Sequence, residues 1–225
     1  MLATVRSVRA LQSETPTWPR TTTVTQVSMR NQSSRAFHPV HSSQYHSTSK
    51  RFISTEIIQN SNQVNRGQYV VKKTEYGWGI SADRDFDEGE VVIVLKAKSV
   101  DSTPHIYSLQ AGWQKHVNLE DPLQLLNHSC DASTTVRDNE FGVYDLVARR
   151  SLVRGDEITF DYETTEYCMS SEFDCLCGTE KCRGRLRGYK WNHDAVHREY
   201  GNNVAAYLLS DHPSDMDNNG PSDQQ

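Results

Sequence analysis

Three cysteines in the C-terminal third of the chain have the spacing of a metal site. Cys175, Cys177 and Cys182 follow the pattern C-x-C-x4-C within eight residues. The chain has five cysteines, an odd number, and its start lacks the apolar core of a secretory signal, so a disulfide framework is not expected. Structural zinc takes four tetrahedral ligands, commonly cysteine thiolates. The sequence therefore predicts a zinc site with three local ligands and a fourth from elsewhere, for which Cys168 is the nearest candidate.

The segment Gly77-Trp78-Gly79 is a candidate for close contact with a ligand. Glycine lets the backbone approach a bound molecule, although a G-x-G is also common at turns and bulges. The segment is not a dinucleotide fingerprint, because a third glycine and a following helix are missing.

Asn127 and His128, followed by Ser129 and Cys130, form a second polar cluster. An asparagine amide offers two donors and an acceptor, which suits an amino-acid-like ligand, although a turn or a helix cap is the ordinary interpretation. Adjacent histidine and serine side chains rarely face one another, so a protease dyad is not indicated. Tyr162 ends an expected strand, where an interfacial aromatic is the ordinary role.

Short strands separated by turns must position these residues, which favours a mainly β, β-rich α+β fold. The expected strands are 68–72, 90–98, 106–110, 113–117, 134–137, 142–148 and 158–162. Asp121-Pro122 opens a short helical turn. Residues 192–209 are a possible C-terminal helix, which Gly201 weakens. Its apolar face consists of Val196, Tyr200, Val204 and Leu208.

The charge divides the chain into two segments. Residues 1–55 hold seven Lys or Arg and one acid, Glu14, so their net charge is +6, against −11 for the remainder and −5 for the whole chain. The basic, amphipathic start predicts either a mitochondrial transit peptide or a disordered basic arm. A mitochondrial location is suggested, with the nucleus or cytoplasm as alternatives. Residues 210–225 are expected to be a disordered acidic tail.

Taken together and in this order, the four motifs resemble a SET-domain protein-lysine methyltransferase with a post-SET zinc motif. The resemblance covers roughly residues 67–191. It implies a SET domain at 56–166, a post-SET zinc segment at 167–191, and several small curved sheets with a knot-like threading. Only the resemblance suggests this threading, because knotted chains are rare in general.

The resemblance also assigns roles. It implies that S-adenosylmethionine is the cofactor, that Cys130 rather than Cys168 is the fourth zinc ligand, and that Tyr162 is catalytic. Tyr107 is a candidate second channel tyrosine. Phe160 and Trp191 are expected at the substrate channel, and a phenylalanine at 160 favours di- or trimethylation. The cofactor is expected to contact Gly77, Trp78, Gly79, Asn127 and His128.

Methyl transfer to lysine requires a neutral amine, whereas free lysine has a pKa of about 10.4. Desolvation and a neighbouring sulfonium charge lower that pKa. Most of the catalysis is then positioning in a near-attack geometry, which a tyrosine hydroxyl can support.

The expected partner is a protein with a Lys-containing basic segment, either a histone or a non-histone protein. Two groups of acids could steer such a segment or could be ordinary solvated surface. The first is Asp83, Asp85, Asp87, Glu88 and Glu90, and the second is Glu163, Glu166, Glu172 and Asp174. A monomer is expected, and no apolar run is long enough for a membrane helix.

Two rival functions remain. Gln124, Ala132 and Ser133 depart from the family pattern, which favours a catalytically weak SET-like interaction module. A zinc-stabilised nucleic-acid adaptor is the other rival, although direct nucleic-acid binding is not expected. Its basis is the alternation of Lys181, Arg183, Arg185 and Arg187.

Overall fold

The computed structural model describes residues 53–74 and 77–213. All of them belong to Arg51–Gln225, the second of the two units into which the chain divides. The interpretations of 1–55 and 210–225 therefore fall almost wholly outside the described residues.

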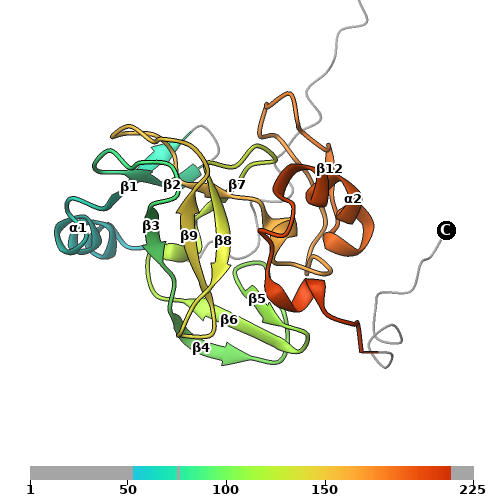
Figure 1. Ribbon diagram of the computed structural model, residues 1–225. Helices are drawn as coiled ribbons and strands as arrows, with labels where there is room; N and C mark the ends of the chain where they lie inside the picture. The colour runs from blue at the N-terminus through green and yellow to red at the C-terminus, as the bar shows by residue number, and fades with distance from the viewer. Residues whose placement is uncertain (1–52, 75–76, 214–225) are drawn as a thin grey trace, which may run out of the picture. The chain divides into compact units, whose positions relative to one another are not determined.

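The described chain forms five small β-sheets, as Figure 1 shows. The mainly β fold class is therefore confirmed, and the knot-like threading remains a prediction. The strand pairs or orders are β1 (Tyr69–Thr74) with β2 (Gly77–Ala82); β3 (Val91–Val94), β9 (Tyr144–Ala148) and β8 (Thr134–Asp138); β4 (Ala97–Asp101), β6 (Lys115–Leu119) and β5 (Leu109–Gly112); β7 (Asn127–His128) with β10 (Thr159–Phe160); and β11 (Phe173–Asp174) with β12 (Arg185–Leu186).

The pairing of β7 with β10 is parallel, whereas the pairings within the other four sheets are antiparallel. In the parallel pair Asn127 lies opposite Thr159 and His128 lies opposite Phe160. Two candidate motifs that are about thirty residues apart in sequence therefore become neighbours.

One α-helix was not expected from the sequence. This helix, α1 (Thr55–Val64), is capped by Ser54, whose hydroxyl accepts a hydrogen bond from the Ile57 N–H at 3.2 Å. Asn62 holds it against β1, because its side-chain oxygen accepts from the Val71 N–H at 2.7 Å. Sequence patterning missed α1 because its buried face is narrow, consisting of Ile58 and Ser61.

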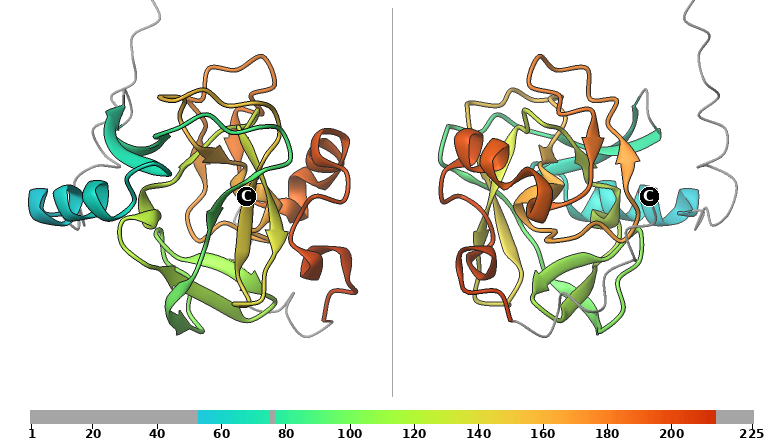
Figure 2. Two further views of the ribbon diagram at one scale, coloured as in Figure 1. Left: turned by 60° about the vertical axis from the view of Figure 1, so that its left-hand side comes forward. Right: turned by 90° about the vertical axis from the view of Figure 1, so that its right-hand side faces the viewer.

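The C-terminal helix begins and ends earlier than the predicted range 192–209. It is α2 (Tyr189–Tyr200), which ends at Gly201 with φ 57°. Glycine accepts this left-handed conformation without strain and so terminates helices. Val204 and Leu208 are still buried, but from a loop and the 3₁₀ turn η4 (Ala206–Leu209). Figure 2 shows α1 and α2 on opposite sides of the sheets.

Several expected strands are shorter than predicted, and two of them differ most. The segment 90–98 divides into β3 and β4 around Leu95, which is fully buried and whose N–H donates to the Tyr144 carbonyl at 2.9 Å. The segment 158–162 is a strand only at β10. Asp161 then caps the 3₁₀ turn η3 (Tyr162–Thr164) by accepting from the Glu163 N–H at 3.1 Å. Tyr162 therefore begins a turn instead of ending a strand.

The interior consists of one large apolar cluster and a separate small one. The large cluster includes Ile80, Phe86 and Tyr144 and extends through the sheets. The small cluster contains Cys130, Cys175 and Leu186, with Phe173, Cys177 and Cys182 against it. A third 3₁₀ turn, η2 (Leu123–Leu125), immediately precedes β7. Among residues 53–74 and 77–213, no helix is long and apolar enough to span a membrane.

Candidate functional site

The sulfur atoms of four cysteines form a cluster in the structure. The Sγ atoms of Cys130, Cys175, Cys177 and Cys182 all lie within 4.8 Å of one another. The Cys130 and Cys175 sulfurs are 3.8 Å apart, which agrees with the separation of about 3.8 Å required by a tetrahedron with zinc–sulfur bonds of about 2.3 Å. Cys168 is not a member of this group. The four residues fit a structural zinc ion in number, type and geometry.

The electrostatics of the cluster favour a thiolate at Cys130. Hydrogen bonding from Cys175 lowers the pKa of Cys130 below its ordinary value, with further contributions from His128 and the Arg183 N–H, although burial opposes the shift. The pKa of Cys175 is raised because it shares this interaction. Since the thiolate is the form that binds metals, the charge distribution is suitable for a metal ligand.

His128 lies between the cysteine cluster and Tyr162. Its Nδ1 accepts a hydrogen bond from the Tyr162 N–H at 3.2 Å, and its Nε2 lies 3.3 Å from the Cys130 sulfur. Because Nδ1 accepts, the hydrogen-bond network assigns the proton of the neutral ring to Nε2, which donates to the sulfur. The imidazole is therefore fully engaged and only 4% exposed, and the cofactor contact of His128 stays a prediction.

The hydroxyl of Tyr162 is held in a fixed direction. It donates to the Leu126 carbonyl at 2.7 Å. Its ring packs against Phe160 at a centroid distance of 4.9 Å and against Phe173 at 6.3 Å. Loss of water raises the pKa of Tyr162 above its ordinary range, and neighbouring carboxylates add to the shift. Tyr162 therefore presents a neutral, oriented hydroxyl next to an aromatic surface.

Gly79, Asn127 and Glu157 form a polar cradle at β2. The Asn127 amide donates to Glu157 Oε1 at 2.7 Å and to the Trp78 carbonyl at 3.4 Å. A Cβ atom at Gly79 would come within 2.7 Å of Glu157 Oε1 and 2.8 Å of Asn127 Nδ2. The absence of a side chain at 79 is therefore what allows this amide–carboxylate pair to lie against the strand. Gly77 has a φ of 132°, which also favours glycine.

Glu157 was not predicted as a site residue, although it directly precedes the expected strand 158–162. The feature of the sequence that could have indicated Glu157 is its position directly before Ile158, which is buried. Such a position requires a partner for the carboxylate, and here the partner is Asn127.

The remaining predicted aromatics lie partly in solvent. Trp78 is 42% exposed on β2, Tyr107 is 39% exposed before β5, and Trp191 is 37% exposed on α2. The Arg187 guanidinium lies 4.5 Å from the Trp191 ring centroid. Of the predicted channel residues, Phe160 contacts Tyr162 directly, and the channel roles of Tyr107 and Trp191 stay predictions.

The interpretation of Glu163 and Glu166 as surface acids is wrong. Glu163 is 0% exposed and Glu166 is also buried, whereas Glu172 and Asp174 reach solvent. Glu163 shares the cation of Arg183 with the equally buried Asp161, at 2.8 Å and 2.6 Å respectively. Burying carboxylates without partners is very unfavourable, so the pairing explains how they are accommodated.

The alternating basic residues are engaged in ion pairs, which does not favour the nucleic-acid adaptor. A nucleic-acid surface requires basic side chains available to phosphates, but all four have carboxylate partners here. These pairs join Lys181 to Asp131 and Glu199, Arg183 to Asp161 and Glu163, Arg185 to Glu172 and Asp174, and Arg187 to Glu172.

Two of the three residues that depart from the family pattern, Ala132 and Ser133, are buried in the interior. The Ser133 hydroxyl donates to the Glu157 carbonyl at 2.9 Å, and the Ser133 N–H donates to Thr159 Oγ1 at 3.0 Å. Ala132 is fully buried. Ser133 therefore joins β10 to the loop after Cys130 and helps to position Tyr162.

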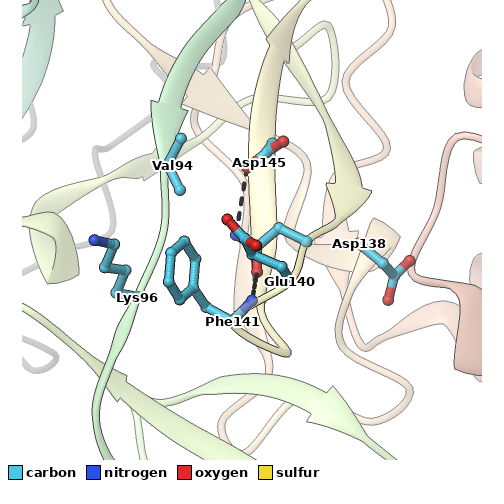
Figure 3. Close-up of a pocket in the computed structure, with 7 residues that line it drawn as sticks. Val94, Lys96, Asp138, Glu140, Phe141 and Asp145 are labelled. Carbon is cyan, nitrogen blue, oxygen red and sulfur yellow. Dashed lines mark hydrogen bonds between the residues drawn. The ribbon is translucent and has the colours of Figure 1, made fainter.

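A separate pocket of about 530 Å³ lies where β3 ends beside the β8–β9 turn (Figure 3). The Lys96 ammonium lies 4.5 Å from the Phe141 ring centroid there. The pocket is lined by Val94, Lys96, Asp138, Asn139, Glu140, Phe141 and Asp145. None of the predicted site residues is among them, so this pocket is distinct from the candidate active site.

Comparison with known proteins identifies the central domain. Residues 77–163 match the model of the SET domain family, and this region of the chain is a SET domain. The resemblance read from the motifs is therefore confirmed over these residues.

Similar proteins include methyltransferases. The chain is 34% identical over 110 residues to Methyltransferase flvH of Aspergillus flavus, covering 48% of this chain and 57% of that protein. It is 25% identical over 138 residues to the putative histone-lysine N-methyltransferase ASHH4 of Arabidopsis thaliana, covering 52% of this chain and 38% of that protein. The chain thus spans little more than half of the first relative and less of the second.

Among solved structures, the chain is similar to the methyltransferase domain of human histone-lysine N-methyltransferase SETMAR. The TM-score is 0.42 and the identity is 18%, over 53% of this chain and 58% of that structure.

Proposed function

We propose that the chain is an S-adenosylmethionine-dependent protein-lysine methyltransferase stabilised by zinc. The observation that carries the proposal is the fixed Tyr162 hydroxyl, bonded to the Leu126 carbonyl at 2.7 Å within one residue of Asn127. This arrangement combines a neutral hydroxyl and an amide-lined cradle in the SET domain with a cysteine cluster that joins this domain to the segment after it. The methyltransferase names of its relatives support the same reaction class.

The cofactor would be held at β2 and β7. The N–H groups of the Asn127 amide bond to Glu157 and to the Trp78 carbonyl, so its side-chain oxygen would accept from the ammonium of an amino-acid end. Gly79 lets this amide–carboxylate pair lie against the strand. When bound, the cofactor would supply a methyl group attached to a positively charged sulfur. Transfer of this methyl group to a neutral lysine amine would form the N–C bond, break the C–S bond and release a proton from the amine.

Tyr162 would orient the amine and the methyl group. Its hydroxyl remains neutral because its pKa is raised. Since its hydrogen is donated to the Leu126 carbonyl, its oxygen would accept from groups at the reacting centre. Positioning of this kind supplies most of the catalysis in a direct displacement. Phe160, which packs on Tyr162 and has no hydroxyl, would leave space for the second and third methyl groups.

Zinc would bind through Cys130, Cys175, Cys177 and Cys182. Its role is structural, because the four thiolates leave no open position for a substrate. The ion would tie the segment after Cys182 to the loop after His128. Folding of that segment and metal binding would therefore be coupled.

The proposed substrate is a lysine in a basic protein segment. Histones are one candidate, because several relatives are named histone-lysine N-methyltransferases. Of the acids expected to steer such a segment, Glu172 and Asp174 lie at the surface, but Arg185 pairs with both and Arg187 pairs with Glu172, so we assign these two acids no role in substrate binding.

The test combines cofactor binding with methyl transfer. Calorimetry should detect S-adenosylmethionine binding, and labelled cofactor should mark lysine-containing peptides on an array that includes histone tails and mitochondrial protein sequences. Arrays with arginine in place of each lysine provide the control. Absence of cofactor binding would refute the proposal that the chain is an S-adenosylmethionine-dependent methyltransferase. Cofactor or peptide binding without transfer to any peptide or lysate protein would favour the interaction-module rival.

A further inference from the structure

Glu163, the neighbour of Tyr162, is a buried acid that the proposed chemistry does not use. It lies in η3 and is 0% exposed. An ionised carboxylate in such a place requires strong partners to offset its lost hydration. All of the partners of its side chain come from the segment that follows Cys182.

Four donors surround the carboxylate. Its Oε2 accepts from Arg183 Nε at 2.8 Å. Its Oε1 accepts from the Arg187 N–H at 3.0 Å, the Gly188 N–H at 2.9 Å and the Asn192 amide at 2.7 Å. Charge-assisted bonds of this kind are about twice as strong as neutral ones. One side chain therefore holds the zinc segment and the first turn of α2 on the residue next to Tyr162.

The backbone around Gly188 shows how closely the segment fits. A Cβ atom at Gly188 would come within 2.4 Å of the Tyr167 carbonyl oxygen, and its φ of 122° also requires glycine. The backbone of residues 183–192 therefore packs tightly against Tyr167 at Gly188. The Gly188 N–H points at the Glu163 carboxylate.

Arg183 extends the connection to the cysteine cluster. Its guanidinium pairs with Asp161 at 2.6 Å and with Glu163 at 2.8 Å, so it joins the residues on both sides of Tyr162. Its own N–H lies 3.4 Å from the Cys130 sulfur. Besides His128, which contacts both Cys130 and Tyr162, Arg183 and the two buried acids therefore form a second connection from the cluster to the turn that carries Tyr162.

We infer that Glu163 is a positioning residue that docks residues 183–192 against the turn carrying Tyr162 and so couples metal occupancy of the cysteine cluster to the placement of the tyrosine. This inference rests on the proposed function for its catalytic consequence. The docking itself is independent of that function.

The test compares Glu163→Gln with Glu172→Gln. Glutamine retains one acceptor oxygen but presents an amide to Arg183, so it breaks the charged contact with little change in volume. Glu172 is the matched control because it pairs with Arg185 and Arg187 of the same segment at the surface. The readouts are zinc content, hydrogen exchange over residues 159–164 and 183–192, cofactor affinity, and kcat with KM.

Glu163→Gln should keep its zinc and bind cofactor with little change. Exchange over 183–192 should be faster, and kcat should fall by about 10–10²-fold, since small displacements of a reacting group cost this much. Removing zinc with a chelator should speed exchange over 159–164 in the wild-type protein and change it much less in Glu163→Gln. Glu172→Gln should behave like the wild type.

Equal hydrogen exchange and equal kcat in Glu163→Gln and Glu172→Gln would overturn the inference. An equal effect of zinc removal on the exchange of residues 159–164 in the wild type and in Glu163→Gln would also overturn it. If Glu163→Gln does not fold, Asn192→Ala decides, because it removes one donor to Glu163 and leaves the pair with Arg183. It should give a smaller change in the same direction, and no change in exchange would overturn the inference. A wild-type protein without methyl transfer would refute the proposed function alone, because zinc content and exchange still test the docking.

Discussion

The main chain of Tyr162 donates a hydrogen bond to the ring of His128 at 3.2 Å. The other ring nitrogen of this histidine lies 3.3 Å from the Cys130 sulfur. A single imidazole therefore separates the candidate catalytic tyrosine from the candidate zinc site. Metal binding in this domain is expected to influence the active site as well as stability.

Replacing Cys130 by serine should abolish zinc binding. Cys130 is one of the four clustered sulfurs, and three remaining thiolates leave a structural site incomplete. Zinc should be measured by elemental analysis of the purified protein, together with hydrogen exchange of the segment after Cys182. Cys168→Ser is the matched control and should keep the metal. Loss of zinc from Cys168→Ser with retention in Cys130→Ser would show that the fourth ligand is assigned wrongly.

Replacing Tyr162 by phenylalanine should lower turnover by about 10²–10³-fold, as expected for the loss of one preorganised polar contact at the transition state. The change removes a hydroxyl bonded to Leu126 and retains the ring packed on Phe160. Zinc content and cofactor affinity should therefore change little. Labelled methyl transfer and calorimetry measure the two effects, and a variant that turns over at the wild-type rate would exclude the catalytic role of Tyr162.

Adding a methyl group at Gly79 should weaken cofactor binding before it affects the fold. The new Cβ would force apart the Asn127 amide and the Glu157 carboxylate, which approach within 2.8 Å of its position. Gly112→Ala is a suitable control, since a Cβ there meets only the Lys115 Cβ at 3.4 Å. Calorimetry should show a raised Kd for Gly79→Ala and a wild-type Kd for Gly112→Ala. Equal affinities in both variants would argue against a cofactor site at this cradle.

The stability of the domain should fall as pH rises through the range in which Glu166 ionises. Burial raises the pKa of Glu166 to about 8, although the Gln110 N–H opposes the shift. An unfolded glutamate has a pKa of about 4.3. Between these values the folded state binds more protons than the unfolded state, so its stability decreases with increasing pH.

Glu166→Gln removes this charge and keeps an acceptor for Gln110. Its thermal unfolding temperature should therefore depend less on pH between about pH 6 and pH 8, where the wild type loses stability. Glu172→Gln should retain the wild-type slope, because that carboxylate lies at the surface. If the unfolding temperatures of the wild type and of Glu166→Gln changed with pH in the same way, the raised pKa of Glu166 would not be the cause of the pH dependence.

The basic segment 1–55 is predicted to direct the chain to mitochondria and to be shortened near residues 52–55. A fluorescent fusion of residues 1–64, which ends with α1, tests this by imaging and N-terminal sequencing. Changing Arg6 and Arg9 to glutamate should abolish import, because transit peptides are poor in acids. A diffuse or nuclear signal with an intact start would reject the prediction and would keep nuclear histones among the candidate substrates.

Local sequence determined the β-rich class and three of the four candidate metal ligands. Alternating β-branched segments and turn residues act over a few positions, so the β8–β9 hairpin was predicted almost to its bounds. Cys175, Cys177 and Cys182 are close in sequence, and their convergence needs only one short loop. The motif order also identified the SET domain, which the match over 77–163 confirms.

The tertiary structure decided which distant residues complete the site. It brings Cys130 to the local cysteines, places Glu157 on Asn127, and buries Glu163 under Arg183. A run of acids after Tyr162 has the same local pattern whether it is solvated or buried. The outcome depends on whether cations and N–H groups from elsewhere in the chain offset the lost hydration, and only the folded arrangement supplies those partners.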